Sequence, residues 1–181
     1  MNVYETNPNN ALFVAAFMSK IKPDWWSYDS ALASLTNPAI TSFYMGESEK
    51  EPVGFINIKE HETHSYVELW GYGYDDNGEF ATGEGMALLY EAVEQYAGSK
   101  GLKSVRTTMT WTEVSFSDLC PTTYAKELLK IASNCEEILA RQTTKKRAYP
   151  YLLNRGYYPN GLVPDCYGEG LHGLMLLKYL S

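Results

Sequence analysis

The sequence lacks the features that mark membrane and secreted proteins. None of its apolar runs approaches the roughly 18 residues that a membrane-spanning helix needs. The stretch from Met1 to Asn10 also lacks the basic region that begins a signal peptide. We therefore expect a cytoplasmic protein with no membrane partner.

Cysteine and histidine are scarce, with three of each among 181 residues. An odd number of widely spaced cysteines fits neither a disulfide framework nor a zinc site, so we expect reduced packing residues. His61 and His64 are too few for a metal centre at a polar turn, and His172 is isolated. The sequence predicts no metal, and it predicts that these histidines are solvated. The cysteines are Cys120, Cys135 and Cys166.

Basic residues are also few: the sequence contains 15 Lys and Arg against 22 Asp and Glu, which gives a net charge of −7. A nucleic-acid partner is disfavoured, because phosphates need a basic surface. The negative balance mildly favours a cationic partner, although acidity that serves only solubility is the better explanation.

A glycine-marked loop organises the rest of the chain. A β-rich segment, 65–74, leads through an acidic turn to Gly83 and Gly85, and a helix follows directly. Unpaired backbone N–H groups and the positive end of a helix dipole can together bind an anion. The alternative is that the two glycines only allow a tight turn between the strand and the helix. Met86 follows Gly85 where a Walker loop needs lysine, and Leu88 replaces the third glycine of a dinucleotide fingerprint.

Hydrophobic periodicity predicts alternating helices and strands in one domain. The strands at 65–74 and 104–110 should be parallel, because a helix connects them, and their carboxyl ends should border a ligand crevice. The first helix should bury Leu12, Phe13, Ala16, Phe17 and Ile21. Trp25, Trp26 and Tyr28 should pack onto the sheet. The predicted helices are 9–21, 24–35, 86–97, 124–140 and 148–155, and the other strands are 40–45, 53–60 and 171–180.

The loop and a later segment, Ala148-Tyr-Pro-Tyr-Leu-Leu-Asn-Arg-Gly156-Tyr157, together resemble the GNAT superfamily of acyl-CoA-dependent N-acyltransferases. That family reads Arg/Gln-x-x-Gly-x-Gly/Ala in the loop and Ala-x-x-Leu-Tyr-x-x-x-Gly-Phe later. The resemblance covers residues 53–180. It implies a single α/β domain, 1–181, with a mixed, mostly antiparallel sheet, a central parallel βαβ unit and flanking helices. An inserted helical segment at about 111–144 and a possible homodimer complete this expectation.

The resemblance implies acetyl-CoA as co-substrate, with no metal. Its pyrophosphate would bind the amides of the loop, and its pantetheine would follow the backbone of the preceding strand. The predicted cofactor-binding residues are Trp70, Tyr72, Tyr74, Phe80, Thr82, Gly83, Glu84, Gly85 and Met86. For Trp25, Trp26 and Tyr28, the resemblance implies a substrate wall as the alternative to packing onto the sheet.

In GNAT proteins the amine attacks the thioester directly, so the protein must supply a base, an oxyanion partner and an acid. We predict Glu68 as the base, with a solvent-facing structural carboxylate as the alternative. The tyrosine that donates the proton in the family aligns here with Leu152. Tyr151 is therefore our first candidate acid and Tyr149 the second, with core packing as the alternative for each.

The predicted function is transfer of an acetyl group to a primary amine of a small molecule or peptide, such as a polyamine, an aminoglycoside or a lysine-bearing peptide. The alternatives are a non-catalytic sensor of coenzyme A or a nucleotide, and a purely structural or interaction protein. Leu152 favours the sensor. Phe80 in place of Arg or Gln, and the negative charge of Glu84, disfavour tight coenzyme binding.

Overall fold

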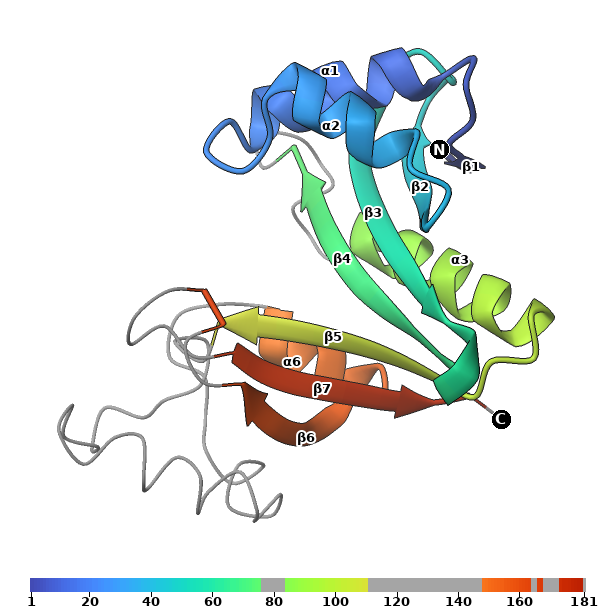
Figure 1. The fold of residues 1–181 in the computed structure, drawn as a ribbon, viewed down its shortest axis with the longest axis vertical. Helices are drawn as coiled ribbons and strands as arrows, with labels where there is room; N and C mark the ends of the chain where they lie inside the picture. The colour runs from blue at the N-terminus through green and yellow to red at the C-terminus, as the bar shows by residue number, and fades with distance from the viewer. Residues whose placement is uncertain (76–83, 111–147, 164–165, 168–172, 181) are drawn as a thin grey trace, which may run out of the picture. The chain divides into compact units, whose positions relative to one another are not determined.

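A computed structural model describes residues 1–75, 84–110, 148–163, 166–167 and 173–180 (Figure 1). These residues form two compact units, Met1–Val105 with Leu180, and Arg106–Tyr179. The first unit contains β1 (Asn2–Glu5), α1 (Ala11–Ile21), α2 (Tyr28–Leu35), β2 (Ile40–Gly46), β3 (Pro52–His61), the short 3₁₀ turn η1 (Glu62–His64), β4 (Tyr66–Tyr74) and α3 (Glu84–Ser99). β5 (Ser104–Thr110) begins in it and continues into the second unit, which adds α6 (Ala148–Asn154), β6 (Tyr158–Val163) and β7 (Gly173–Tyr179).

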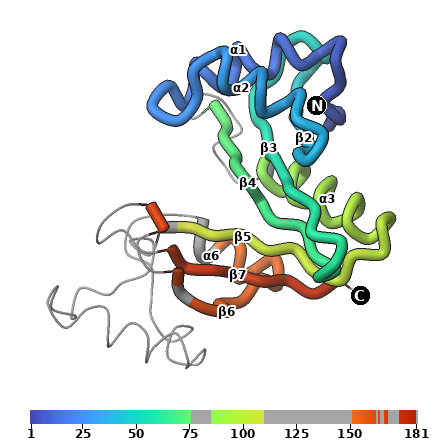
Figure 2. Tube along the Cα trace, in the orientation of Figure 1, coloured from blue at the N-terminus to red at the C-terminus, as the bar shows by residue number. Residues whose placement is uncertain are grey.

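The strands follow the order β1-β2-β3-β4-β5-β7-β6. β1 to β4 pair antiparallel with their neighbours, as do β6 and β7, and Figure 2 traces the β3–β4 hairpin through η1. The backbone N–H of Lys103 donates to the carbonyl of Ser65 at 2.7 Å. These residues directly precede β5 and β4, so the two strands begin at the same edge and run parallel, with α3 between them in sequence. The predicted mixed sheet with a βαβ unit is confirmed.

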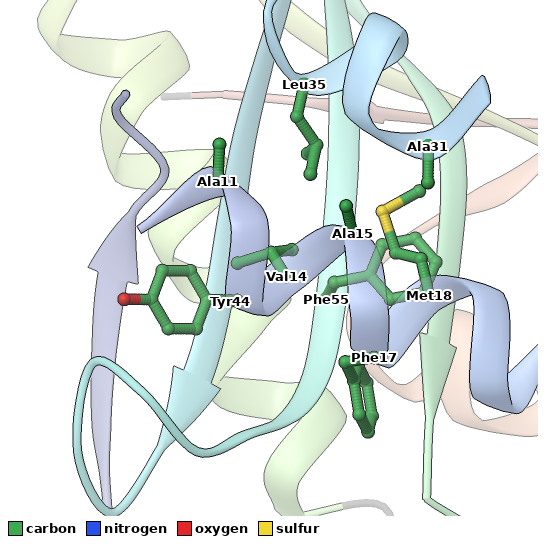
Figure 3. Close-up of a cluster of buried hydrophobic side chains, with 9 residues drawn as sticks. All are labelled: Ala11, Val14, Ala15, Phe17, Met18, Ala31, Leu35, Tyr44 and Phe55. Carbon is green, nitrogen blue, oxygen red and sulfur yellow. The ribbon is translucent and has the colours of Figure 1, made fainter. Parts of the chain in front are cut away.

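In the first unit, helices cover both faces of the sheet. Tyr44 of β2 and Phe55 of β3 face α1, and their core is completed by α2 (Figure 3). Phe43, one position earlier in β2, points the other way and meets Tyr96 of α3 with the ring centroids 5.5 Å apart. This alternation follows from the two-residue period of a strand. The cluster on the α1 side contains Ala11, Val14, Ala15, Phe17, Met18, Ala31, Leu35, Tyr44 and Phe55.

The predicted buried stripe of α1 is mostly wrong. Leu12 is 51% exposed and Phe13 is 37% exposed, while Ala11, Val14 and Ala15 are buried. Both sets recur at helical spacing, because α1 is apolar around much of its circumference. The buried set includes the small residues Ala11 and Ala15, which belong to the cluster that α1 shares with α2, β2 and β3.

The second helix begins later than predicted, at Tyr28 rather than at 24. The Oγ of Ser27 accepts a hydrogen bond from the backbone N–H of Ser30 at 3.1 Å, which caps the helix. Trp25 and Trp26 therefore lie in the connection between the helices. Trp25 is exposed, as is Tyr28, so only Trp26 of these three packs partly against the unit, as the sheet-packing interpretation requires.

The remaining helix predictions are confirmed where the structure describes them. α3 buries Met86, Leu89, Val93 and Ala97, at the predicted spacing. Gly156, with φ +84°, follows α6 and ends it as predicted. Two strands were missed, the four-residue β1 and β6, whose pairing is irregular between Pro159 and Gly161. Among the described helices, none is long and apolar enough to cross a membrane.

Candidate functional site

A β-bulge interrupts β4 at Trp70. Asn57 of β3 pairs with Gly71, and the next residue, Ile58, pairs with Leu69. Trp70 therefore has no partner in β3, and its side chain is 52% exposed. A bulge bends the strand and changes the direction of its side chains, and bulges are frequent beside active sites.

Polar side chains gather on one face of the hairpin next to this bulge. Lys59 pairs with Glu68, and His61 pairs with Tyr66, so all four side chains lie on the same face. The Nε2 of His61 lies 3.2 Å from Oε2 of Glu68. The Nζ of Lys59 lies 5.5 Å from the ring centroid of Trp70. We call these five residues the Glu68 face.

The Glu68 face combines an accessible carboxylate with ordered neighbours. The Glu68 side chain is 36% exposed and that of His61 is 25% exposed. His61 stacks on Tyr66 with ring centroids 4.4 Å apart and an angle of 18° between the planes. The prediction that His61 is a solvated turn residue is wrong, because the residue ends β3 and is held by two neighbours on β4.

The opposite face of the hairpin carries a different carboxylate, Glu60. Its Oε1 accepts a hydrogen bond of 2.5 Å from the hydroxyl of Tyr96 in α3, and that hydroxyl also lies 3.3 Å from Oγ1 of Thr41. Burial, together with the hydrogen bond to Glu60, raises the pKa of Tyr96. Since Glu60 is engaged in holding α3 against the sheet, Glu68 is the better placed of the two to meet a substrate.

Glycines in β4 make room for side chains from the α1 region. A Cβ on Gly71 would lie 3.4 Å from the ring of Trp26. A Cβ on Gly73 would lie 2.8 Å from Cδ1 of Ile21 and 2.8 Å from the ring of Phe55. β4 is thus bare of side chains where α1 and the following connection approach it, directly after the bulge.

The space above Gly73 gives the first testable prediction. Gly73→Ala should lower the free energy of unfolding by about 1–3 kcal/mol, because the ring of Phe55 and the end of Ile21 must move. Gly98→Ala is the matched control, since a Cβ there meets nothing within 4 Å and Ala is favoured in a helix. Urea denaturation of both variants tests this, and equal stability of the two would contradict it.

The residues predicted to bind the cofactor are only partly described. Tyr72 and Tyr74 are half-buried and pair with Ile56 and Gly54, on the face that α3 covers. Met86 and Gly85 are buried in the first turn of α3, which begins at Glu84. Trp70 lies on the Glu68 face. Phe80, Thr82 and Gly83 lie outside the described residues, as does the side chain of Glu84.

The candidate acids belong to the second unit. Leu152 is 1% exposed and is a core residue of α6. The adjacent Tyr151 is half-buried, and its hydroxyl oxygen is shielded from solvent. Tyr149 belongs to the same helix, with its side chain outside the described part. Which tyrosine donates a proton stays a prediction.

Other sequence predictions fall partly outside the described residues. These include the inserted segment at 111–144, two cysteines and His172. Cys166 is described and is exposed, and its Sγ would lie 3.1 Å from a Cβ on Gly173. Within the described ranges, no group of three or more His, Cys, Asp or Glu side chains is arranged to hold a metal ion.

Comparison with known proteins identifies the fold. No family model matches the sequence, and no curated protein matches it significantly. An aminoglycoside 6'-N-acetyltransferase complexed with coenzyme A has a similar structure, at 16% identity and a TM-score of 0.77, covering 100% of this chain and 98% of the other.

Two further solved structures agree with this match. The ribosomal-protein-S18-alanine N-acetyltransferase from Escherichia coli is 11% identical, with a TM-score of 0.64 and coverage of 99% and 94% of the two chains. A GNAT-family acetyltransferase from Streptococcus pneumoniae is 12% identical, with a TM-score of 0.62 and 99% coverage of both chains. The chain therefore has the GNAT acetyltransferase fold, which confirms the fold that the two sequence motifs predicted.

Proposed function

We propose that this chain, which has the GNAT fold, transfers the acetyl group of acetyl-CoA to a primary amine of a small molecule or peptide. The observation that carries the proposal is the position of Glu68. Its carboxylate is accessible, lies two residues before the β4 bulge, and belongs to a fold whose solved members include N-acetyltransferases.

Each step of the transfer has a candidate group in the chain. Glu68 accepts a proton from the ammonium group, directly or through water, and the freed amine attacks the thioester carbonyl. Backbone N–H groups at the bulge stabilise the negative charge that develops on the carbonyl oxygen. The C–S bond then breaks, and the leaving thiolate receives a proton from Tyr151 or, as second choice, Tyr149. The nitrogen gives up its remaining extra proton, which yields the neutral amide and restores the tyrosine.

The co-substrate would be held by backbone rather than by charged side chains. The first turn of α3 presents unpaired N–H groups to the pyrophosphate, and Gly85 adds no side chain there. Pantetheine would follow β4 toward the bulge at Trp70. The coenzyme A bound in the aminoglycoside 6'-N-acetyltransferase structure supports acyl-CoA use by this fold.

The acceptor that we favour is a polycationic amine of the aminoglycoside type. The net charge of −7 favours a cationic ligand, and two structurally similar proteins are aminoglycoside 6'-N-acetyltransferases. A protein N-terminus is the alternative acceptor, supported by the similarity to the ribosomal-protein-S18-alanine N-acetyltransferase. We retain a cytoplasmic location and a homodimer as part of the proposal.

Release of free thiol from acetyl-CoA tests the proposal. The purified chain is incubated with acetyl-CoA and, in separate reactions, with kanamycin A, spermidine or a peptide that begins with alanine. We expect amine-dependent thiol release and a product carrying one acetyl group by mass spectrometry. Thiol release that no amine accelerates would contradict an acetyltransferase function.

The burial of Leu152 favours a second candidate, a sensor that binds coenzyme A without turnover, because a leucine cannot protonate a thiolate. A thermal-shift measurement with coenzyme A separates the two. Both functions predict stabilisation by a few kcal/mol, about 2.7 at 100 times the dissociation constant. Stabilisation without turnover would identify a sensor, and no stabilisation at all would indicate a structural protein.

A further inference from the structure

One contact of the Glu68 face is not explained by the proposed reaction, namely the contact between Glu68 and His61. The cross-strand partner of Glu68 is Lys59, a cation that could pair with it directly. Instead, the Lys59 ammonium lies over the ring of Trp70, and the Glu68 carboxylate lies 3.2 Å from the Nε2 of His61. The carboxylate therefore pairs diagonally across the hairpin, on the side away from the bulge.

The imidazole is itself fixed in place. His61 stacks on Tyr66, and the ring of His64 stacks near the same tyrosine with centroids 6.3 Å apart. An ionised carboxylate only accepts hydrogen bonds, so the Nε2 of His61 must carry the proton that is donated to Oε2. Both the neutral and the protonated imidazole can make this bond, so the contact does not depend on the charge of the histidine.

We propose that His61 is a positioning residue for Glu68. The bond to Oε2 restricts the rotation of the carboxylate and leaves Oε1 available to accept the proton of the amine. The role rests on the proposed acetyl transfer, in which Glu68 is the base. Preorganisation of this kind raises kcat, because the base needs no reorientation at the moment of reaction.

Two substitutions of His61 separate the hydrogen bond from the stacking. His61→Phe keeps an aromatic ring against Tyr66 and removes the donor. It should lower kcat roughly tenfold and leave the KM for acetyl-CoA unchanged. In His61→Gln the side-chain amide nitrogen can reach the position of Nε2, so this variant should restore kcat to within about threefold of the wild type.

His64→Phe is the matched control. This variant also replaces a histidine that stacks on Tyr66 with phenylalanine. In the described hairpin, Glu68 is hydrogen-bonded to His61 and not to His64. We expect kcat within about twofold of the wild type. If His64→Phe slows the reaction as much as His61→Phe does, stacking explains the effect and the proposal is overturned.

A double substitution tests whether His61 acts through Glu68. In a Glu68→Gln background, His61→Phe should cause no further loss of kcat, because the carboxylate that it positions is gone. Losses that multiply would overturn the proposal. All assays use the full chain, acetyl-CoA and the best acceptor among kanamycin A, spermidine and the alanine peptide.

The two proposals fail in different ways. A chain that acetylates none of these amines disproves the proposed function and, with it, this role of His61. If the chain acetylates an amine and His61→Phe turns over at the wild-type rate, only the positioning role is disproved.

Discussion

Glu68→Gln should lower kcat for acetyl transfer by roughly 100- to 10,000-fold, the range over which a positioned general base contributes. Glutamine keeps the size of the side chain but cannot accept the proton of the ammonium group. The KM for acetyl-CoA should change little, since Glu68 is expected to act on the amine and not on the coenzyme. Steady-state thiol release with the best acceptor measures both constants.

Glu60→Gln is the control for this experiment. It places the same substitution on the same hairpin, but Glu60 faces α3 and accepts a hydrogen bond from Tyr96. We expect a small loss of stability and a nearly unchanged kcat. If both variants lose activity equally, or if neither does, Glu68 is not the base.

Phe55→Ala should lower the free energy of unfolding by about 3–5 kcal/mol, the range for phenylalanine removed from a well-packed core. Phe55 is 0% exposed and forms an edge-to-face contact with Phe17 of α1, with ring centroids 6.4 Å apart. It also lies close to Gly73, so its removal leaves a cavity where α1 meets β3 and β4. Urea denaturation followed by circular dichroism measures the change.

Phe13→Ala is the corresponding control for burial. Phe13 lies on α1 and was predicted from the sequence to be buried, but it is 37% exposed. A surface substitution of this kind typically changes stability by no more than about 0.5 kcal/mol. A loss equal to that of Phe55→Ala would show that the other face of α1 forms the core.

The sequence was sufficient to predict the order of most elements and the βαβ unit. A 3.6-residue period marks α3, and two-residue alternation marks β4 and β5, because each of these elements has neighbours that bury part of its surface. β3 shows no such alternation, because its residues 54–58 are all buried. α1 was harder, since it is apolar on both sides, and only the sheet determines which side is buried. α2 begins at Tyr28 because the hydroxyl of Ser27 caps it. The prediction started the helix at residue 24, because it counted Trp25 and Trp26 as part of the helical pattern.

The candidate site was predictable in part. Glu68 was identified from its place in the strand before the glycine loop, and the structure places it on an accessible polar face. The bulge at Trp70 has no sequence signal, because it depends on the register between two strands. The contact with His61 was missed for the same reason. Residues seven positions apart meet here only because η1 closes the hairpin in a specific register.

A crystal structure of the chain with coenzyme A would test the central claim most directly. The account predicts that pantetheine lies along β4, that its sulfur reaches the bulge at Trp70, and that the Glu68 carboxylate faces the same space. A sulfur directed away from β4, or no coenzyme bound at saturating concentration, would contradict the assignment of acetyl transfer to this site.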